Sequence, residues 1–344
     1  MKVTIPDQLK ADVPSTAFGK ILSATPVVMA VVATMLAGLA SSEMTRAQYD
    51  RSLGAQQQSK AGDQWSFFQA KRLRGALQQN TVDLLESTTE LHPFDPAALK
   101  TAVQQSPQAA PPAEVEKSKN DLEAFLGSGA GQQTIEMLKT GNVPHVDEGT
   151  PIDPRVKAAM DAMENLKPDS EMVALLAQVD NQTIDRTLVV ARDRAQAFDL
   201  ATKPINQAID QFEQLLAGQM ALSERSPAVA DATQPVQKPA PVFQVNRDFT
   251  VARLRYASAR YEVEARLNQV IANLYELQVR KSNISAEHHH SRSQRFFFGM
   301  LGAQLGVIIS TFALAARNRS LLWSLAAGAG ILAVVFAIYV YLYV

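Results

Sequence analysis

The sequence contains no cysteine, which excludes disulfide bonds, thiolate metal sites and cysteine nucleophiles. It also lacks an excess of charge of either sign, because 33 Lys and Arg residues are balanced by 34 Asp and Glu residues. A protein without an overall basic field does not hold nucleic acid by neutralising phosphates, so we expect no nucleic-acid partner.

Sequence motifs that carry catalysis are absent as well. The chain has no Gly-x-Ser-x-Gly, no His-Glu-x-x-His, and no acidic pair in a context that identifies an acid and a base. The glycine-rich run at 127–131 is interpreted as a flexible helix connector, since no strand precedes it and it lacks the Lys and Ser/Thr of a phosphate loop. We expect no enzyme and no cofactor; a deep polar pocket in the middle of the chain would favour an enzyme.

The sequence does contain three long apolar runs, at residues 21–40, 296–316 and 321–344. At ~1.5 Å rise per residue, each is long enough for a helix that crosses a hydrocarbon core of roughly 30 Å. We predict a transmembrane helix at 21–41 and a transmembrane hairpin at 295–344 that turns at the basic loop 317–319. The N-terminal tail, 1–20, precedes either a signal peptide or an uncleaved anchor. The length of the first run favours the anchor.

No alternating strand pattern competes with helix between the apolar runs, so we predict an all-α membrane protein. Helix-forming residues and proline positions divide this region into segments. The predicted segments are a long stalk helix at 42–90, a helical head domain at 91–225, a Pro-rich linker at 226–245 and a return stalk helix at 246–294. Antiparallel pairing of the two stalks would bury their apolar stripes. Glu264 and Asn268 interrupt a strict heptad, which favours a short bundle with extra helices over a pure two-stranded coiled coil.

Two parts of the chain resemble a known family. The string at residues 63–72 carries the first pattern, Asp63, Trp65, Gln69, Ala70 and Lys71. Near the end, Glu287 and three histidines precede a membrane hairpin with a basic turn and Trp323. Both features, at 63–72 and 287–323, resemble domain-of-unknown-function family 4337, bacterial membrane proteins without an assigned activity. The resemblance implies three spans and supplies no reaction. Residues 95–245 show no match, and we expect an insertion there.

Candidate sites outside the membrane have ordinary alternatives. His288, His289 and His290 are weak candidates for a metal site, since imidazoles near a helix end can share an ion with Glu287. Adjacent helical positions point about 100° apart, which favours a role among lipid headgroups and no metal. Trp65 and its neighbours Phe67 and Phe68 suit either a ligand-stacking patch or core packing, and their helical spacing favours packing.

Small residues within the spans predict close helix packing. Gly302 and Gly306 form a Gly-x-x-x-Gly pair, and Ala326 with Gly330 repeats that spacing on the third span. Gln304 would be costly facing lipid, so we expect it to face another helix and to donate a hydrogen bond there.

Two function classes remain open. The first is a structural or interaction protein that is anchored in the lipid bilayer, forms a homo-oligomer and presents a helical stalk and head to protein partners. The second is an oligomeric channel or transport component built from the three spans. We expect a multi-pass protein of the bacterial plasma (inner) membrane. The positive-inside bias applies mainly to short loops, so the basic N-terminal tail and the 317–319 turn predict a cytoplasmic N-terminus and a large domain outside.

Overall fold

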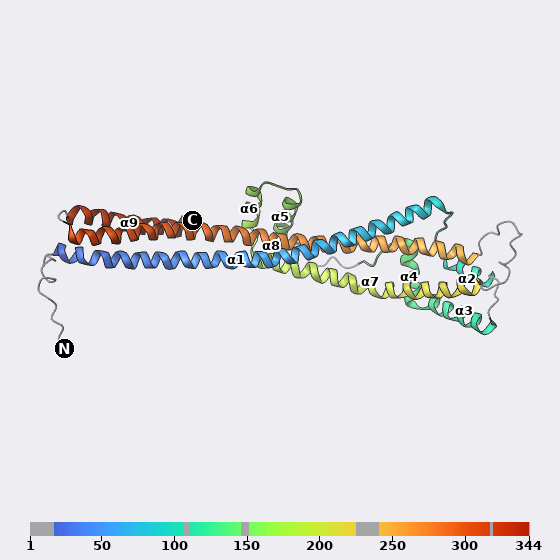
Figure 1. The fold of residues 1–344 in the computed structure, drawn as a ribbon. Helices are drawn as coiled ribbons and strands as arrows, with labels where there is room; N and C mark the ends of the chain where they lie inside the picture. The colour runs from blue at the N-terminus through green and yellow to red at the C-terminus, as the bar shows by residue number, and fades with distance from the viewer. Residues whose placement is uncertain (1–16, 106–110, 146–150, 225–240, 317–318, 344) are drawn as a thin grey trace, which may run out of the picture. The chain divides into compact units, whose positions relative to one another are not determined.

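The computed structural model describes residues 17–105, 111–145, 151–224, 241–316 and 319–343. These residues form α-helices and no strands, which confirms the predicted all-α class (Figure 1). The helices are α1 (Ala17–Thr88), α2 (Pro96–Gln105), α3 (Pro112–Gly127), α4 (Gly129–Thr140), α5 (Pro154–Glu164), α6 (Asp169–Ala177), α7 (Asn181–Glu224), α8 (Pro241–Ala315) and α9 (Arg319–Tyr343).

Three of these helices, α1, α8 and α9, contain segments long and apolar enough to cross a membrane. The first predicted span and the first stalk are one helix of 72 residues, and the return stalk runs into the second span within a helix of 75 residues. Most of the predicted linker at 226–245 lies outside the described part of the chain, which omits residues 225–240. Its last five residues are helical, since α8 begins at Pro241, and proline is tolerated in the first turn of a helix.

Local chemistry explains several helix ends. Asp153 accepts a hydrogen bond from the backbone N–H of Arg155 and Pro154 follows it, as predicted for the start of α5. The run at 127–131 differs from the predicted connector, because Ser128 alone separates α3 from α4. The Ser128 hydroxyl accepts from the N–H of Gly131, so Gly129 and Gly131 lie in the first turn of α4, whereas Gly127 ends α3. That helix ends at Gly141, whose φ of 69° suits glycine.

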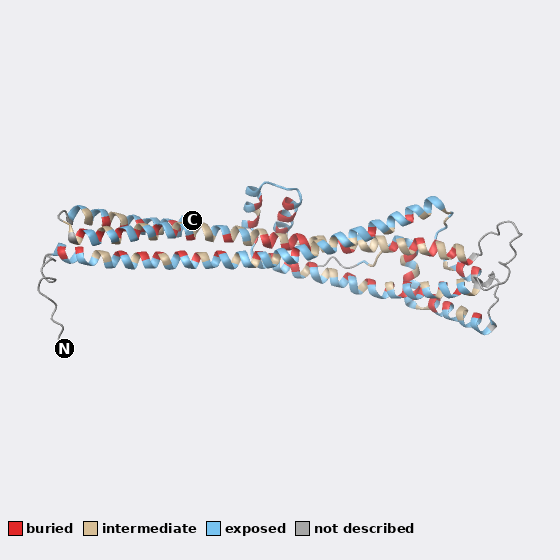
Figure 2. Cartoon of the chain, viewed as in Figure 1, coloured by how far each residue is buried: buried red, intermediate tan, exposed pale blue. Residues whose placement is uncertain are grey.

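The chain divides into two compact units. Unit 1 comprises residues 1–58 and 278–344, and in its described part α1, α8 and α9 lie side by side (Figure 1). Buried positions on α1 recur at alternating steps of three and four residues, among them Ala33, Leu36, Ala40 and Glu43 (Figure 2). Small residues dominate the core: Ala33, Leu36, Ala40, Phe296, Ala303, Ala333 and Val340.

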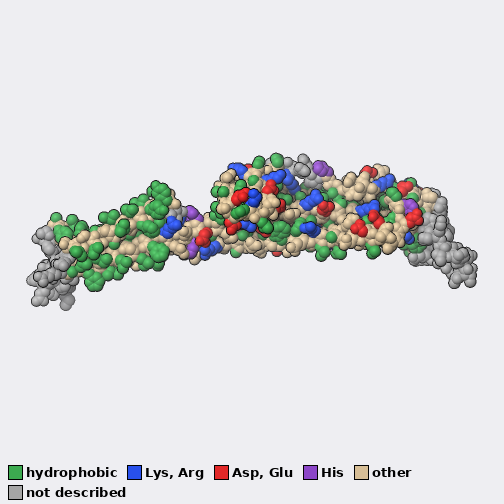
Figure 3. All heavy atoms as spheres, turned by 90° about the horizontal axis from the view of Figure 1, so that it is seen from above, with side chains coloured by type: hydrophobic (Ala, Val, Ile, Leu, Met, Phe, Trp, Pro, Cys, Tyr) green, Lys and Arg blue, Asp and Glu red, His purple; other side chains and the backbone are tan. Residues whose placement is uncertain are grey.

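Unit 2 comprises residues 59–277 and has a core of large side chains. Phe212 on α7 is fully buried and contacts Phe94, Phe125 and Phe249 at ring-centroid distances of 4.9–5.8 Å. On the face shown in Figure 3, acidic and basic side chains are spread over this unit, whereas hydrophobic side chains cover the spans of unit 1.

Candidate functional site

A buried carboxylate lies in unit 1 just past the end of the first apolar run. Glu43 on α1 is 8% exposed, and its Oε2 lies 2.6 Å from Nδ1 of His289 on α8. Its Oε1 lies 3.9 Å from the Arg292 guanidinium and 3.5 Å from that of Arg46. Burial of a carboxylate is costly unless opposite charges or donors surround it, and Glu43 meets this requirement with donors from both helices.

Arg292 links this cluster to the third helix. Its guanidinium donates to the backbone carbonyl of Tyr341 at 3.0 Å and lies 5.8 Å from the centroid of the Tyr341 ring. Tyr341 lies in the last turn of α9, where carbonyl groups have no partner within the helix and where a cation interacts favourably with the helix dipole. Glu43, His289, Arg292 and Tyr341 therefore connect all three helices of unit 1, and we call them the boundary cluster.

A second set of polar contacts continues this pairing away from the spans. Ser285 donates to a carboxylate oxygen of Asp50 at 2.7 Å, and Ser282 donates to Gln57 at 3.2 Å. Residue numbers rise along α1 as they fall along α8, so the two helices are antiparallel within unit 1.

The three predicted histidines do not converge. His288 is exposed, His289 belongs to the boundary cluster, and His290 contacts the side chain of Gln294 at 3.0 Å. No group of three or more metal-binding side chains occurs among the described residues. His290 instead lines a pocket of about 610 Å³, whose wall changes from polar at Ser41 and Gln294 to apolar at Phe297 and Phe298.

Only some side chains of the segment 63–72, which resembles the family signature, contact another helix. The Trp65 indole donates to Glu276 Oε1 at 2.6 Å, and Lys71 forms an ion pair with the buried carboxylate of Glu264. Asp63, Gln69 and Ala70 are exposed. Trp65 packs edge to face on Phe68, whereas Phe67 is 55% exposed. The signature thus contributes two polar bonds to the contact between α1 and α8 in unit 2, whereas its aromatic pair lies within α1.

Unit 2 contains a polar pocket of about 440 Å³ lined by α1, α7 and α8. Gln78, Asp210, Arg253, Tyr256 and Arg260 are among its lining residues. Burial raises the pKa of the Tyr256 phenol to about 12, so this hydroxyl stays protonated at neutral pH. Arg253 is held by Glu213 at 2.5 Å and Arg260 lies against Glu264 at 3.4 Å. The two arginines are thereby paired with carboxylates.

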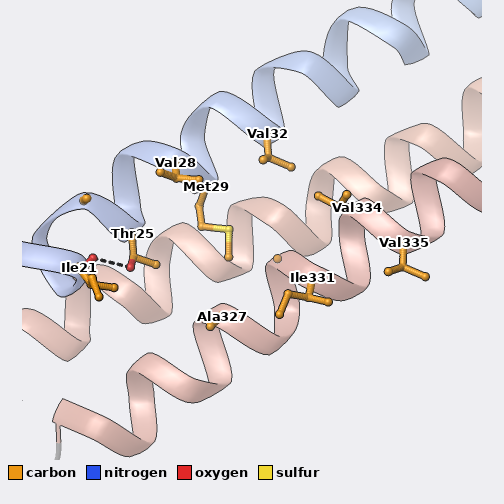
Figure 4. Close-up of a pocket in the computed structure, with 11 residues that line it drawn as sticks. Ile21, Thr25, Val28, Met29, Val32, Ala327, Ile331, Val334 and Val335 are labelled. Carbon is orange, nitrogen blue, oxygen red and sulfur yellow. Dashed lines mark hydrogen bonds between the residues drawn. The ribbon is translucent and has the colours of Figure 1, made fainter. Parts of the chain in front are cut away.

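Two of the small residues predicted at span contacts face the same methionine. A Cβ on Gly306 would lie 3.1 Å from Met29 Cε and one on Gly330 would lie 2.0 Å from it, so Met29 of α1 occupies the space both glycines leave. Ala326 is fully buried, and its carbonyl lies 3.5 Å from the same Gly306 position. Figure 4 shows Met29 extending from α1 toward α9, beside an apolar pocket of about 480 Å³.

Gly302 and Gln304 make no helix contact within the described chain, so the helix contacts predicted for them stay predictions. No heavy atom lies within 4 Å of a Cβ built on Gly302, so this glycine is outside the helix contact that contains Gly306. The Gln304 side chain is exposed on the outside of unit 1 and forms no hydrogen bond with any described residue. Nearly every residue of this span is apolar, so sequence alone does not fix which side faces the bundle.

The boundary cluster was not predicted from the sequence. Glu43 follows the first apolar run and Arg292 precedes the second, and antiparallel pairing brings these two positions to the same level. The sequence therefore did contain a signal for this cluster. An acidic residue follows the first apolar run and a basic residue precedes the second at a similar distance.

The fold and the boundary cluster define an all-α chain with three helices that are long and apolar enough to cross a membrane. Residues 18–134 match the model of the domain of unknown function DUF4337. The match includes the 63–72 string and confirms the resemblance there. It also extends through 95–134, which corrects the expected start of an insertion at residue 95, and 287–323 lies outside the matched segment. Comparisons with curated proteins and with solved structures found no match.

Proposed function

We propose that this protein is a membrane-anchored helical interaction protein without catalytic activity. The three apolar helices of unit 1 form the anchor in a bacterial inner membrane, and unit 2 binds protein partners. The boundary cluster supports an anchoring role, since it uses buried charge to fix the mutual register of α1, α8 and α9.

One observation carries the interaction role. Three leucines on the part of α1 that belongs to unit 2, Leu73, Leu77 and Leu84, are 54–62% exposed. Their spacing of four and seven residues puts them on one face of the helix. Leucines gathered in this way outside the apolar spans are typical of a surface that receives a partner helix or groove.

Site-specific photocrosslinking tests this role. A photoreactive amino acid at Leu84 should capture a discrete partner in cells, and the same amino acid at exposed Asp83, about 100° around the helix, should not. The double substitution Leu73→Ser and Leu77→Ser should abolish capture from position 84 while the helix content stays unchanged. Equal capture from 83 and 84, or capture that survives both serines, contradicts the proposal.

Sidedness forms part of the proposal. Three spans place the N-terminus and the 317–319 turn on one side of the membrane, and we propose that this side is the cytoplasm. A reporter that is active only outside the cytoplasm should be active when it is fused after Val344. Activity confined to a cytoplasmic reporter at that position reverses the assignment.

A channel component is the second candidate, and the exposed amide of Gln304 is the observation that favours it. In an oligomer, such a side chain can line a polar path. Ion flux through liposomes that contain the protein, abolished by Gln304→Leu, would select the channel. The interaction protein predicts no flux in either form.

A further inference from the structure

Gln304 is a polar side chain that the described spans leave without a partner. The serine and threonine hydroxyl groups of the spans are satisfied locally, because each donates to a backbone carbonyl of its own helix. These residues are Ser23, Thr25, Thr34, Ser310, Thr311 and Ser324. The indole of Trp323 donates to Thr25 at 2.9 Å. The amide of Gln304 offers two donors and an acceptor that make no such bond.

The depth of Gln304 prevents it from reaching water. It lies eight residues into the apolar run 296–316, which corresponds to ~12 Å along the helix from one end and ~18 Å from the other. No water is available at that depth, so an exposed amide there keeps the full cost of an unmade hydrogen bond.

The face around Gln304 has the spacing of a helix contact. Phe297, Leu301, Gln304, Ile308 and Thr311 recur at steps of four and three residues, and all five are exposed. The buried seam of the same helix has a similar spacing and faces the bundle. It consists of Phe296, Gly299, Ala303, Gly306, Ser310 and Ala313. The span of α8 therefore has an inner seam that is occupied within the chain and an outer seam that is not.

We propose that a second copy of this chain packs on the outer seam, with the two Gln304 amides hydrogen-bonded to each other. An amide contains both donor and acceptor, so it is complementary to itself. Two copies inserted in the same direction bring Gln304 to the same depth automatically.

Cysteine crosslinking in membrane vesicles tests the geometry, since the natural sequence contributes no cysteine. Leu301→Cys and Ile308→Cys lie on the seam, one turn on either side of Gln304. Phe298→Cys is the control, because Phe298 is 65% exposed on the same helix but about 120° from Gln304. Disulfide-linked dimers should form at 301 and 308 several-fold faster than at 298. Equal rates at the three positions overturn the proposed seam.

The amide contact has its own test in the Leu301→Cys background. Gln304→Leu should weaken dimerisation by about tenfold, as expected for the loss of interhelical hydrogen bonding in a membrane. Gln304→Asn should retain most of it. Thr311→Val is the matched control on the same seam and should have little effect, since the Thr311 hydroxyl bonds to its own helix. Undiminished dimers in Gln304→Leu overturn the amide pairing.

The proposed dimer rests on the proposed membrane anchor. One further measurement shows whether a negative result contradicts the anchor or only the dimer. In intact bilayers the Leu301→Cys thiol should resist a membrane-impermeant maleimide. Rapid labelling contradicts the anchor and the dimer together, whereas protection without crosslinking contradicts the dimer alone.

Discussion

The same two helices, α1 and α8, pair in both units but use different side chains to do so. In unit 1 the core consists largely of alanine, with Gly306 and Gly330 packed on Met29. In unit 2 the core consists of phenylalanine rings and long aliphatic side chains, and the helix contact adds the polar bonds of Trp65 and Lys71.

This difference follows from the solvent that each unit requires. Lipid tails are as apolar as leucine, so burial of a large side chain gains little in a bilayer and close backbone approach becomes the main source of association. In water, burial of aromatic surface supplies the free energy of folding. The two cores therefore predict that shrinking a large side chain is most costly in unit 2, whereas enlarging a small residue is most costly in unit 1.

The largest effect is expected from removal of a large side chain in unit 2. Phe212→Ala should lower the free energy of unfolding by about 3–5 kcal/mol, because Phe212 is fully buried among three other rings. Leu200→Ala on the same helix, where the leucine is 62% exposed, should change it by less than about 0.5 kcal/mol. Chemical denaturation of the purified protein in detergent gives both values. A small loss for Phe212→Ala would show that the aromatic cluster does not hold unit 2 together.

Loss of the buried carboxylate in unit 1 should come next. Glu43→Gln leaves His289 and Arg292 without their anionic partner and should destabilise unit 1 by about 2 kcal/mol. Arg46→Gln is the control, since the Arg46 side chain is 62% exposed and its ion pair contributes little. Denaturant titration of the protein in mixed micelles compares the two, and equal losses would contradict a special role for the boundary cluster.

Enlarging a glycine should matter only on the inner seam. Gly306→Leu overpacks the site that Met29 fills and should cost about 1–3 kcal/mol, with partial recovery when Met29→Ala is added. Gly302→Leu has open space before it and should leave the stability of the three-helix bundle within about 0.5 kcal/mol of the parent. Thermal melting of the three variants in detergent distinguishes this pattern from one in which both glycines pack.

Removal of a single polar bond in unit 2 should have a smaller effect. Trp65→Phe keeps an aromatic ring but removes the indole N–H that donates to Glu276, and should cost about 1.5 kcal/mol. Phe67→Leu, at a 55% exposed position two residues away, is the matched control. If the two variants have the same melting temperature, the hydrogen bond to Glu276 contributes nothing measurable, and packing of the aromatic ring accounts for the contact.

The smallest effect is expected at Asp199 and depends on pH. Partial desolvation, followed by the neighbouring carboxylate of Glu264, raises the pKa of Asp199 above its ordinary value of 3.8. The ionised form is therefore less favourable in the folded state, so Asp199 costs stability at neutral pH and the cost disappears below the unfolded pKa. Asp199→Asn should raise the melting temperature slightly at pH 7 and leave it unchanged at pH 3. An equal shift at both values would exclude titration as the cause.

The sequence predicted structure most accurately where a local pattern of residues is compatible with only one structure. Asp153 followed by Pro154 located the start of α5, and long apolar runs located the spans. Orientation within the spans was not predictable for Gly302 and Gln304, because a helix that is apolar all round lacks a moment that distinguishes its faces. The boundary cluster required knowledge of which residues of α1 and α8 lie at the same level, and that register depends on packing along both helices.

The central claim, that α1, α8 and α9 cross a bilayer while unit 2 stays in water, has a direct test. Val28, Leu305 and Ile331 in the spans and Leu73 in unit 2 are almost equally exposed in the folded chain, at 58–66%. Single cysteines at these four positions, in protein held in lipid nanodiscs, should therefore differ in reactivity only through the lipid. We predict rapid labelling by a membrane-impermeant maleimide at position 73 and protection at 28, 305 and 331 until detergent is added. Rapid labelling of any span position in the intact nanodisc would contradict the membrane anchor.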